Sequence, residues 1–414
     1  MIYDVAIVGA GPSGSVAAIN LARAGVRVLL LDKAVFPRVK PCGGGLSART
    51  FEHFTYLADV FKTVPTRWVT RVVFASPDGN QVEIRDTKPY YAMVRRIEFD
   101  AALLNEARRL GAEFREGCTV QDIRYDVDSV SLVLADGEEV SARMVIAADG
   151  VNSRIAIRSG LRELWRPDQV ALDTTEETPL SQLSCDLDSI YVNFGAGTGF
   201  GYSYVFPKPE HINLGIGFLV SFFKTNVQKH PHELHGELIA ELNGKGIVHG
   251  ASAESNLKSA HIPMTGPVEH LSRERTLLVG DAGGFVNGFS AEGIYYAMRS
   301  GELAALAALA ACKHRDFSAR FLRRYDRTVN SAIGRELRTS VMVGRRLMAS
   351  PTRINKVVAV AKRDPIAAHL LADFGSGRIQ YGELKLRMAM HGFFFTLGSA
   401  VGMVERALKD NHKI

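Results

Sequence analysis

Three glycines close to the N-terminus have the spacing of a turn that binds a dinucleotide. Gly9, Gly11 and Gly14 follow an apolar run at residues 4–9 and open a predicted helix, Pro12–Arg23. Gly9 permits a tight turn, Gly11 lets a pyrophosphate approach the backbone, and Gly14 allows the helix to pack closely. The start of the helix offers unpaired N–H groups to the phosphates. We therefore expect this turn to bind a dinucleotide.

A carboxylate ends the next predicted strand of the same strand–helix–strand unit. Asp32 can accept hydrogen bonds from both hydroxyls of a ribose, and its charge would repel a 2′-phosphate. Ser13, inside the glycine turn, and Lys33, directly after the carboxylate, are expected as neighbouring contacts. This unit alone does not say which dinucleotide binds.

A second glycine-rich segment, far along the chain, decides between FAD and NAD. Asp281 follows the apolar strand predicted at 277–280 and can bond the ribityl chain of an extended FAD. Gly293 and Ile294 begin a long Ala-rich helix, whose N–H groups can face the pyrimidine edge of a flavin and stabilise its reduced form. A domain that binds only NAD has no need of this element. The two segments together predict FAD as the cofactor.

These segments resemble the glutathione-reductase-like flavoproteins, the group that includes aromatic hydroxylases, halogenases and geranylgeranyl reductases. The resemblance covers residues 1 to about 310. It implies that Arg96, at the start of a predicted helix, and Val120, in the strand after it, lie against FAD. Asp149-Gly150 matches another element of the group. Without the resemblance, Arg96 would be an ordinary surface cation and Asp149 a turn residue.

The loop Lys40-Pro41-Cys42-Gly43-Gly44-Gly45-Leu46 resembles the cysteine–glycine loop of the geranylgeranyl reductases. Glycines such as Gly43 and Gly45 would let its backbone approach the flavin ring closely. The resemblance implies a catalytic role for Cys42, which we expect to contact the flavin and to donate a proton. The alternative for a lone cysteine is a small buried side chain that serves packing.

The segment Tyr202-Ser203-Tyr204-Val205-Phe206-Pro207-Lys208 is similar to the Tyr-x-Trp-x-Phe-Pro-Lys signature of the same reductases, with Tyr204 in place of the tryptophan. Tyr202, Tyr204 and Phe206 alternate along a predicted strand and therefore project from one face of it. The resemblance implies that they line a long apolar substrate pocket. The alternative is an ordinary core face on a strand that ends at a proline.

The elements that must position these residues predict a mixed α/β fold. Apolar strands at 4–9 and 26–31 flank the first helix, and short strands alternate with turns over 68–95 and 165–265. We expect a Rossmann-type FAD-binding domain, an interleaved substrate domain with an antiparallel sheet, and a helical C-terminal region. The expected ranges are 1–70, 95–165 and 266–335 for the first, 71–94 and 166–265 for the second, and 336–414 for the third.

Composition narrows the class of protein further. The chain has 414 residues, of which 46% are hydrophobic, enough for a large core, and its formal net charge is +6. Lys and Arg are scattered, so we expect no nucleic-acid partner. The four cysteines form no CxxC pair, and the histidines at 230–261 lack carboxylate partners, so neither a metal site nor a disulfide scaffold is expected. A reducing, cytoplasmic location follows.

The segment Met388–Val404 contains no formal charge. It lies at the lower limit for a transmembrane helix, about 17–25 residues, and its glycines favour a buried or interfacial helix over a membrane span. Together with the positive net charge, the segment predicts a peripheral contact at the inner face of a membrane.

The leading functional hypothesis is an FAD-dependent reductase that saturates C=C bonds of a geranylgeranyl or polyprenyl chain on a lipid, quinone or pigment precursor. The electron donor is expected to be NADPH or a reduced ferredoxin, because the sequence contains no second GxGxxG unit. A flavin-dependent monooxygenase or halogenase of the same fold is the alternative, although neither Trp68 nor Trp165 belongs to a Trp-x-Trp-x-Ile segment. A flavin-bearing binding protein without enzymatic activity is a third possibility.

Overall fold

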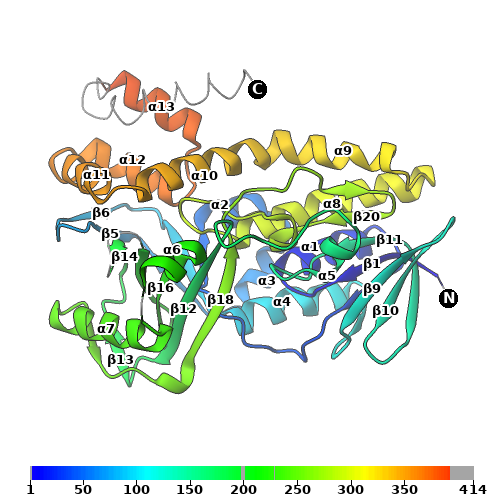
Figure 1. The fold of residues 1–414 in the computed structure, drawn as a ribbon, viewed down its shortest axis with the longest axis horizontal. Coiled ribbons are helices and arrows are strands. Elements are labelled where there is room, and N and C mark those ends of the chain that lie inside the picture. The colour runs from blue at the N-terminus through cyan, green and yellow to red at the C-terminus, as the bar shows by residue number, and fades with distance from the viewer. Residues whose placement is uncertain (1, 197–200, 228, 392–414) are drawn as a thin grey trace.

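The computed structural model describes residues 2–196, 201–227 and 229–391, and it contains two large β-sheets (Figure 1). The first sheet and its helices lie on the right of this view, and the second sheet lies on the left. Helices α9 (Ala319–Val329) and α10 (Arg335–Met348) cross the top of the molecule from one side to the other. The predicted mixed α/β fold is confirmed.

The first sheet contains the strand–helix–strand unit predicted at the N-terminus. Its central strands are all or nearly all buried, as expected where helices cover both faces of a parallel sheet. In the sheet order, the strands are β19 (Ser272–Arg273), β20 (Thr276–Leu278), β11 (Glu139–Ala147), β1 (Tyr3–Val8), β2 (Val28–Leu31) and β8 (Glu113–Arg115). β1 pairs in parallel with both β2 and β11, which brings the predicted glycine turn to the centre of the sheet.

A β-meander extends the first sheet at β11. The strands β9 (Val120–Tyr125) and β10 (Val130–Leu134) form it with β11, all antiparallel. The helices of this part are α4 (Arg96–Arg109), α5 (Arg154–Arg158) and α8 (Ile294–His314), with the 3-10 turn η3 (Gly280–Gly283) before α8. β11 is therefore shared between the meander and the parallel strands.

Helix α1 (Pro12–Arg23) packs directly against α8, although the two helices are far apart in the sequence. The backbones touch: a Cβ atom added at Gly301 would lie 2.1 Å from the carbonyl oxygen of Ser13. Nearby, the Ser300 hydroxyl accepts a hydrogen bond from the Gly280 N–H at 2.9 Å. The first and the last segments of the FAD-binding fold are thus one packed unit.

The second sheet has its strands in the order β18, β12, β16, β15, β14, β5, β6. Their bounds are Leu257–Pro263, Val170–Pro179, His211–Leu219, Gly201–Pro207, Ser189–Ala196, Arg71–Ala75 and Gln81–Arg85, respectively. The sheet differs from the antiparallel prediction at one pair, since β14 and β5 run parallel. A hairpin forces neighbours to be antiparallel, but the chain between these two strands passes through β8 to β11 of the first sheet, so no such constraint applies.

Smaller elements complete the two halves. The short sheets are β3 (Gly45–Ser47) with β7 (Tyr91–Val94) and β4 (Thr66–Val69), and β13 (Leu183–Cys185) with β17 (Val248–Gly250). The remaining short helices are α2 (Ala48–His53), η1 (Thr55–Leu57), α3 (Ala58–Lys62), α6 (Val220–Asn226), α7 (Pro231–Gly244) and η2 (Glu254–Asn256). The predicted substrate segment 71–94 thus includes β7, which pairs with β3 and β4; the domain ranges remain a prediction.

Beyond α9 the described chain is helical, as predicted. A π-helical turn at Asn330–Gly334 joins α9 to α10, and α11 (Pro351–Arg363), α12 (Pro365–Gly375) and α13 (Tyr381–Met390) follow. Helix α11 contacts β6 and β14 of the second sheet. Among the described residues, no helix has the length and apolarity needed to cross a membrane. Most of the apolar segment predicted at 388–404 lies outside the described residues.

Candidate functional site

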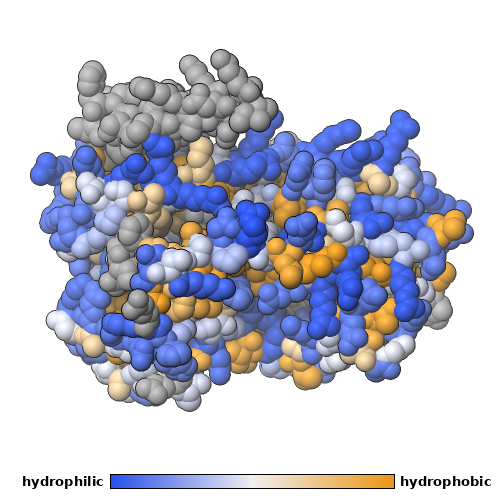
Figure 2. Space-filling model, viewed as in Figure 1, coloured by the Kyte–Doolittle hydropathy of each residue, from blue (hydrophilic) through white to orange (hydrophobic). Residues whose placement is uncertain are grey.

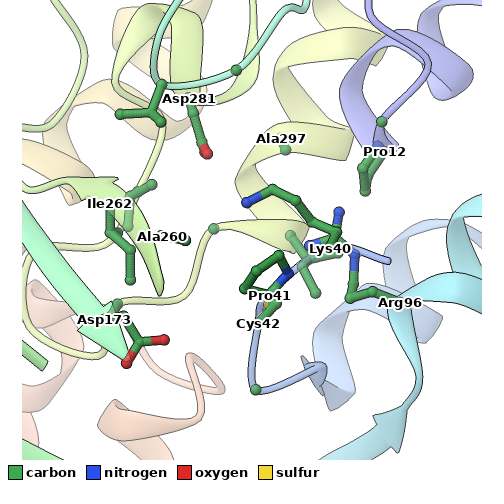
Figure 3. Close-up of a pocket in the computed structure, with 18 of the residues that line it drawn as sticks. Pro12, Lys40, Pro41, Cys42, Arg96, Asp173, Ala260, Ile262, Asp281 and Ala297 are labelled. Atoms are coloured by element: carbon green, nitrogen blue, oxygen red, sulfur yellow. The ribbon is translucent and has the colours of Figure 1, made fainter. Parts of the chain in front are cut away.

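A cavity of about 740 Å³ lies between the two sheets, and it brings together residues from both ends of the sequence (Figure 3). Figure 2 shows apolar surface gathered across the middle of the molecule, while hydrophilic residues cover most of the rest of that face. Every residue that the sequence predicted for the cofactor, the substrate or catalysis lines this cavity, with the exception of Gly14. The lining set is Gly9, Gly11, Ser13, Asp32, Lys33, Cys42, Gly43, Gly45, Arg96, Val120, Tyr202, Tyr204, Phe206, Asp281, Gly293 and Ile294.

The three glycines of the turn have different roles: Gly9 and Gly14 are required by packing, and Gly11 faces the cavity. Gly9 has a φ of +106°, and a Cβ there would lie 2.2 Å from the carbonyl oxygen of Ala148. A Cβ at Gly14 would lie 1.8 Å from the Gly9 carbonyl oxygen, so Gly14 serves the packing of α1 on β1. At Gly11 the nearest atom to such a Cβ is a guanidinium nitrogen of Arg38, 3.6 Å away. A side chain at Gly11 would therefore touch only the flexible end of Arg38, at the start of α1.

Asp32 is buried and holds the glycine turn in place. One carboxylate oxygen accepts a hydrogen bond from the Ala10 N–H at 2.7 Å, and the other accepts one from the Ala34 N–H at 2.8 Å. A carboxylate has about four lone-pair positions, so both oxygens keep capacity for a ribose hydroxyl. Lys33 beside it is exposed at the rim of the cavity.

The far end of the cavity carries the second predicted cofactor segment. Gly293 precedes α8 without any side-chain cap, so the first N–H groups of that helix are available to a ligand. The Asp281 carboxylate has no hydrogen-bond partner within the described chain, and its burial raises its pKa, while the charges of Lys40 and Arg96 act in the opposite direction. In Figure 3, Asp281 and Arg96 lie on different sides of the cavity, with Lys40 between them.

Two arginines that line the cavity, Arg38 and Arg96, share one carboxylate, that of Asp100. Arg96 is buried and forms two hydrogen bonds to Asp100, at 2.7 and 2.8 Å, and Arg38 lies 3.0 Å from the same carboxylate. Burial acts to lower the pKa of Arg96, but Asp100 and the Cys42 sulfur together raise it. The buried Nη1 atom of Arg38 has no hydrogen-bond partner among the described residues. An anionic diphosphate would satisfy it.

The cysteine loop packs tightly on the aromatic strand β15. A Cβ at Gly43 would lie 2.8 Å from the ring of Phe206, and one at Gly44, where φ is +69°, would lie 2.1 Å from the Val94 carbonyl oxygen. The Gly44 N–H donates to the Cys42 sulfur at 3.4 Å. Glycine is therefore required here by contact with β15 and β7, in addition to any contact with a flavin.

The aromatic side chains of β15 share one face, as predicted. The ring centroids of Tyr202 and Tyr204 are 5.8 Å apart, and those of Tyr204 and Phe206 are 4.6 Å apart. All three rings line the cavity. Burial raises the pKa of both tyrosines well above the usual value, so both hydroxyls stay protonated.

Two ionisable residues, one at this wall and one behind the cysteine loop, were not predicted as site residues from the sequence. Lys208 has no exposed side-chain surface, and its ammonium group is paired with Glu177, which also accepts a hydrogen bond from Arg95 at 2.9 Å. Asp173 is 4% exposed and lines the cavity. Lys208 ends the aromatic signature, which is a signal in itself, whereas Asp173 shows only as a carboxylate inside a mostly buried strand.

The cavity residues fit an FAD molecule. Gly11 and the uncapped start of α1 suit a diphosphate, Arg38 offers an unpaired buried donor, and Asp281 with the start of α8 suits the ribityl and flavin part. No group of three or more His, Cys, Asp or Glu side chains within the described ranges is arranged to bind a metal.

Comparisons with known proteins agree with this assignment. The family model of the FAD binding domain matches residues 2–332. Digeranylgeranylglycerophospholipid reductase 2 of Methanopyrus kandleri is 32% identical over 341 residues, which are 78% of this chain and 81% of the relative. Menaquinone reductase of Mycobacterium tuberculosis is 32% identical over 324 residues, 73% of this chain and 75% of the relative.

Solved structures share the fold. A geranylgeranyl bacteriochlorophyll reductase-like protein from Thermoplasma acidophilum superposes with a TM-score of 0.79 at 22% identity, covering 94% of this chain and 98% of that one. A flavin-dependent brominase has a TM-score of 0.71 at 18% identity, covering 91% and 94%. The family match and the curated relatives together show that the chain belongs to the FAD-binding-domain family and is an FAD-dependent oxidoreductase of the geranylgeranyl reductase type.

Proposed function

We propose that the protein saturates C=C bonds of a polyprenyl chain carried by a lipid or a quinone. The observation that carries this proposal is the aromatic wall of Tyr202, Tyr204 and Phe206, which lies in the same cavity as the FAD residues and packs against Gly43 of the cysteine loop. An apolar wall next to the cofactor is what an isoprenoid chain requires, because the chain has no polar group near its double bonds to orient it.

The names of the two curated relatives support this substrate class. One is named as a reductase of digeranylgeranylglycerophospholipid and the other as a reductase of menaquinone. Both substrates contain polyprenyl chains and differ in the headgroup. The proposal therefore names the polyprenyl chain as the part of the substrate that is reduced, and the experiment below identifies the headgroup.

The residues would divide the work as follows. Bound FAD, once reduced, would supply the hydride for the alkene. Gly9 and Gly11 would receive the diphosphate, and Asp281 with the Gly293–Ile294 start of α8 would hold the ribityl chain and the flavin. The aromatic wall would align the alkene and exclude water. We propose that Cys42 lies against the flavin, where the sequence makes its thiol a candidate for the proton that completes the reduction.

We also propose NADPH or a reduced ferredoxin as the electron donor, and a peripheral contact with the inner face of the cytoplasmic membrane. Leu386 and Met390 of α13 are exposed hydrophobic side chains, at 60% and 72%, and the chain has a net charge of +6. Apolar side chains beside positive charge suit an anionic lipid surface. Flotation with anionic vesicles, with and without high salt, tests this contact.

The central experiment uses the purified protein with FAD, reduced without oxygen, and a geranylgeranyl lipid or menaquinone. We expect products heavier by two hydrogens for each step, as measured by mass spectrometry. The wild-type protein without reductant is the control. Hydroxylated or halogenated products, formed when oxygen and halide are added, would instead assign the protein to the monooxygenases or halogenases.

A further inference from the structure

The reaction proposed above needs one proton for each double bond, and the structure contains an unassigned acid at the substrate wall. Asp173 lies on β12, which β16 separates from the aromatic strand β15, and only 4% of its surface is exposed. Figure 3 shows its carboxyl group directed into the cavity, on the opposite side from Asp281. Of the cavity residues contributed by the described strands of the second sheet, it is the only carboxylic acid.

The two oxygens of Asp173 have different surroundings. Oδ2 accepts a hydrogen bond from the Tyr204 hydroxyl at 3.1 Å. Oδ1 is buried and has no hydrogen-bond partner among the described residues. A buried polar atom without a partner is unusual and indicates a group that serves something besides stability. Here the free oxygen can carry a proton and present it to the cavity.

The position of Asp173 relative to the cysteine loop is set by Tyr204. The Tyr204 ring lies 3.4 Å from a Cβ built at Gly43, on the cysteine-loop side. On the other side, a Cβ at Gly215 would lie 2.6 Å from the Tyr204 hydroxyl oxygen, so only glycine leaves room for the hydroxyl to reach Asp173. The Tyr204 side chain therefore spans the distance between the loop and the acid.

The surroundings of Asp173 favour its protonated form. Burial raises its pKa to about 7, and the Tyr204 hydrogen bond and the charge of Lys40 act in the opposite direction. The other titratable side chains that line the cavity near it are Tyr202 on β15, Cys42 on the loop and His261 on β18. An acid whose pKa is close to the working pH is suited to proton transfer.

We propose that Asp173, held by Tyr204, is the acid that protonates the alkene in the proposed reduction, in place of the Cys42 thiol. The O–H bond of the carboxylic acid breaks, and its proton forms a C–H bond at one alkene carbon. The hydride from reduced FAD forms the C–H bond at the other carbon, so the electron pair of the π bond and that of the hydride account for both new bonds. Asp173 is left as a carboxylate and regains a proton from water after product release. Tyr204 is a positioning residue.

The test compares Asp173→Asn with Cys42→Ser in FAD-loaded, anaerobically reduced protein given a geranylgeranyl lipid in a single turnover. Asp173→Asn should lower the rate of alkene reduction by about 100-fold or more, with FAD content and chemical reduction of the flavin unchanged. Cys42→Ser should lower it by less than about tenfold. Asp136→Asn, at an exposed turn, is the matched surface control. Reduction that survives Asp173→Asn but is lost in Cys42→Ser would overturn the assignment.

A second measurement reports the protonation state of the acid directly, without turnover. Infrared spectra of the wild-type protein should contain the band of a protonated, buried carboxylic acid that disappears as the pH rises through about 7. Tyr204→Phe removes a hydrogen bond that favours the carboxylate, so the midpoint of this loss should move to higher pH. If the wild-type protein shows the band but reduces no polyprenyl substrate, the proposed function fails and the proton-donor role fails with it. If it reduces the substrate but shows no such band, the assignment of Asp173 alone fails.

Discussion

The buried ion pair of Lys208 and Glu177 predicts that substituting one partner destabilises the protein more than substituting the other. Glu177→Gln leaves the Lys208 ammonium, which has no exposed surface, without its anion. Removing one partner of a buried pair costs about 3–5 kcal/mol of unfolding free energy. Lys208→Met should cost less, about 1–2 kcal/mol, because Glu177 is 25% exposed and keeps its bond to Arg95. The double variant should cost about as much as Lys208→Met alone, since no unpaired buried charge remains.

The pH dependence of the stability loss in Glu177→Gln tests independently whether a buried, unpaired lysine causes it. Burial lowers the pKa of Lys208 below its ordinary value, and Glu177 acts to raise it. In Glu177→Gln the pKa of Lys208 in the folded protein should fall further. Between that pKa and the higher pKa of the unfolded chain, the unfolded chain binds more protons than the folded protein, so the unfolding free energy of the variant rises with pH. The loss relative to wild type should therefore shrink at alkaline pH.

Urea unfolding, monitored by circular dichroism, measures the unfolding free energy of the wild type, the two single variants and the double variant. All four are measured at the same FAD concentration, because bound cofactor adds stability. Equal losses in the two single variants that add up in the double variant would refute the reasoning. So would a loss in Glu177→Gln that grows at alkaline pH, because a charged lysine would then not be its cause.

Three further outcomes follow from the geometry of the cavity. Gly9→Ala should abolish FAD binding, measured by flavin absorbance, because its Cβ would meet a main-chain oxygen at 2.2 Å; Gly79→Ala also has a positive φ but meets nothing within 4 Å and should retain FAD. Gly43→Ala should impair alkene reduction, since its Cβ meets an aromatic ring at 2.8 Å. Gly45→Ala should impair it less, because its Cβ would meet the flexible Met93 side chain at 3.4 Å and the Phe206 ring only at 3.8 Å. Between pH 3.8 and about 7 the folded protein keeps the Asp173 proton that the unfolded chain loses, so wild-type stability should fall relative to Asp173→Asn by about 1.4 kcal/mol per pH unit. Urea titrations across that range check this difference, and a constant difference would contradict it.

Local signals were sufficient to predict two segments that line the cavity. Gly9, Gly11 and Asp32 belong to one short strand–helix–strand unit, and Asp281 and Gly293 belong to one strand–turn–helix. The type and spacing of these residues predict the segments, because each glycine is required by a close contact within a few residues or with one neighbouring strand. Both segments line the same cavity and pack against each other, since a Cβ at Gly280 would lie 2.7 Å from the Ser13 hydroxyl oxygen.

The substrate end depended on pairings that the sequence does not display. Asp173 faces the cavity because β12 pairs with β16 at Gly217 and with β18 at Ala260, and a shift by one residue would turn the carboxyl to the other face. Lys208 was visible as the end of a signature, but its burial depends on Glu177 reaching it from another strand. The parallel pairing of β14 with β5 is likewise a long-range choice that no local pattern records.

The contact between Ser13 and Gly301 also bears on how the protein matures during translation. The glycine turn emerges from the ribosome first, but the helix that packs on it is completed only when α8, ending at His314, has been made. Before that, until Ala147 has been made, β1 also lacks its partner β11, and its apolar side chains lack part of their cover. Contacts so distant in sequence slow folding and prolong the exposure of apolar surface. The nascent chain should therefore depend on chaperones, and FAD should bind only after release of most of the polypeptide.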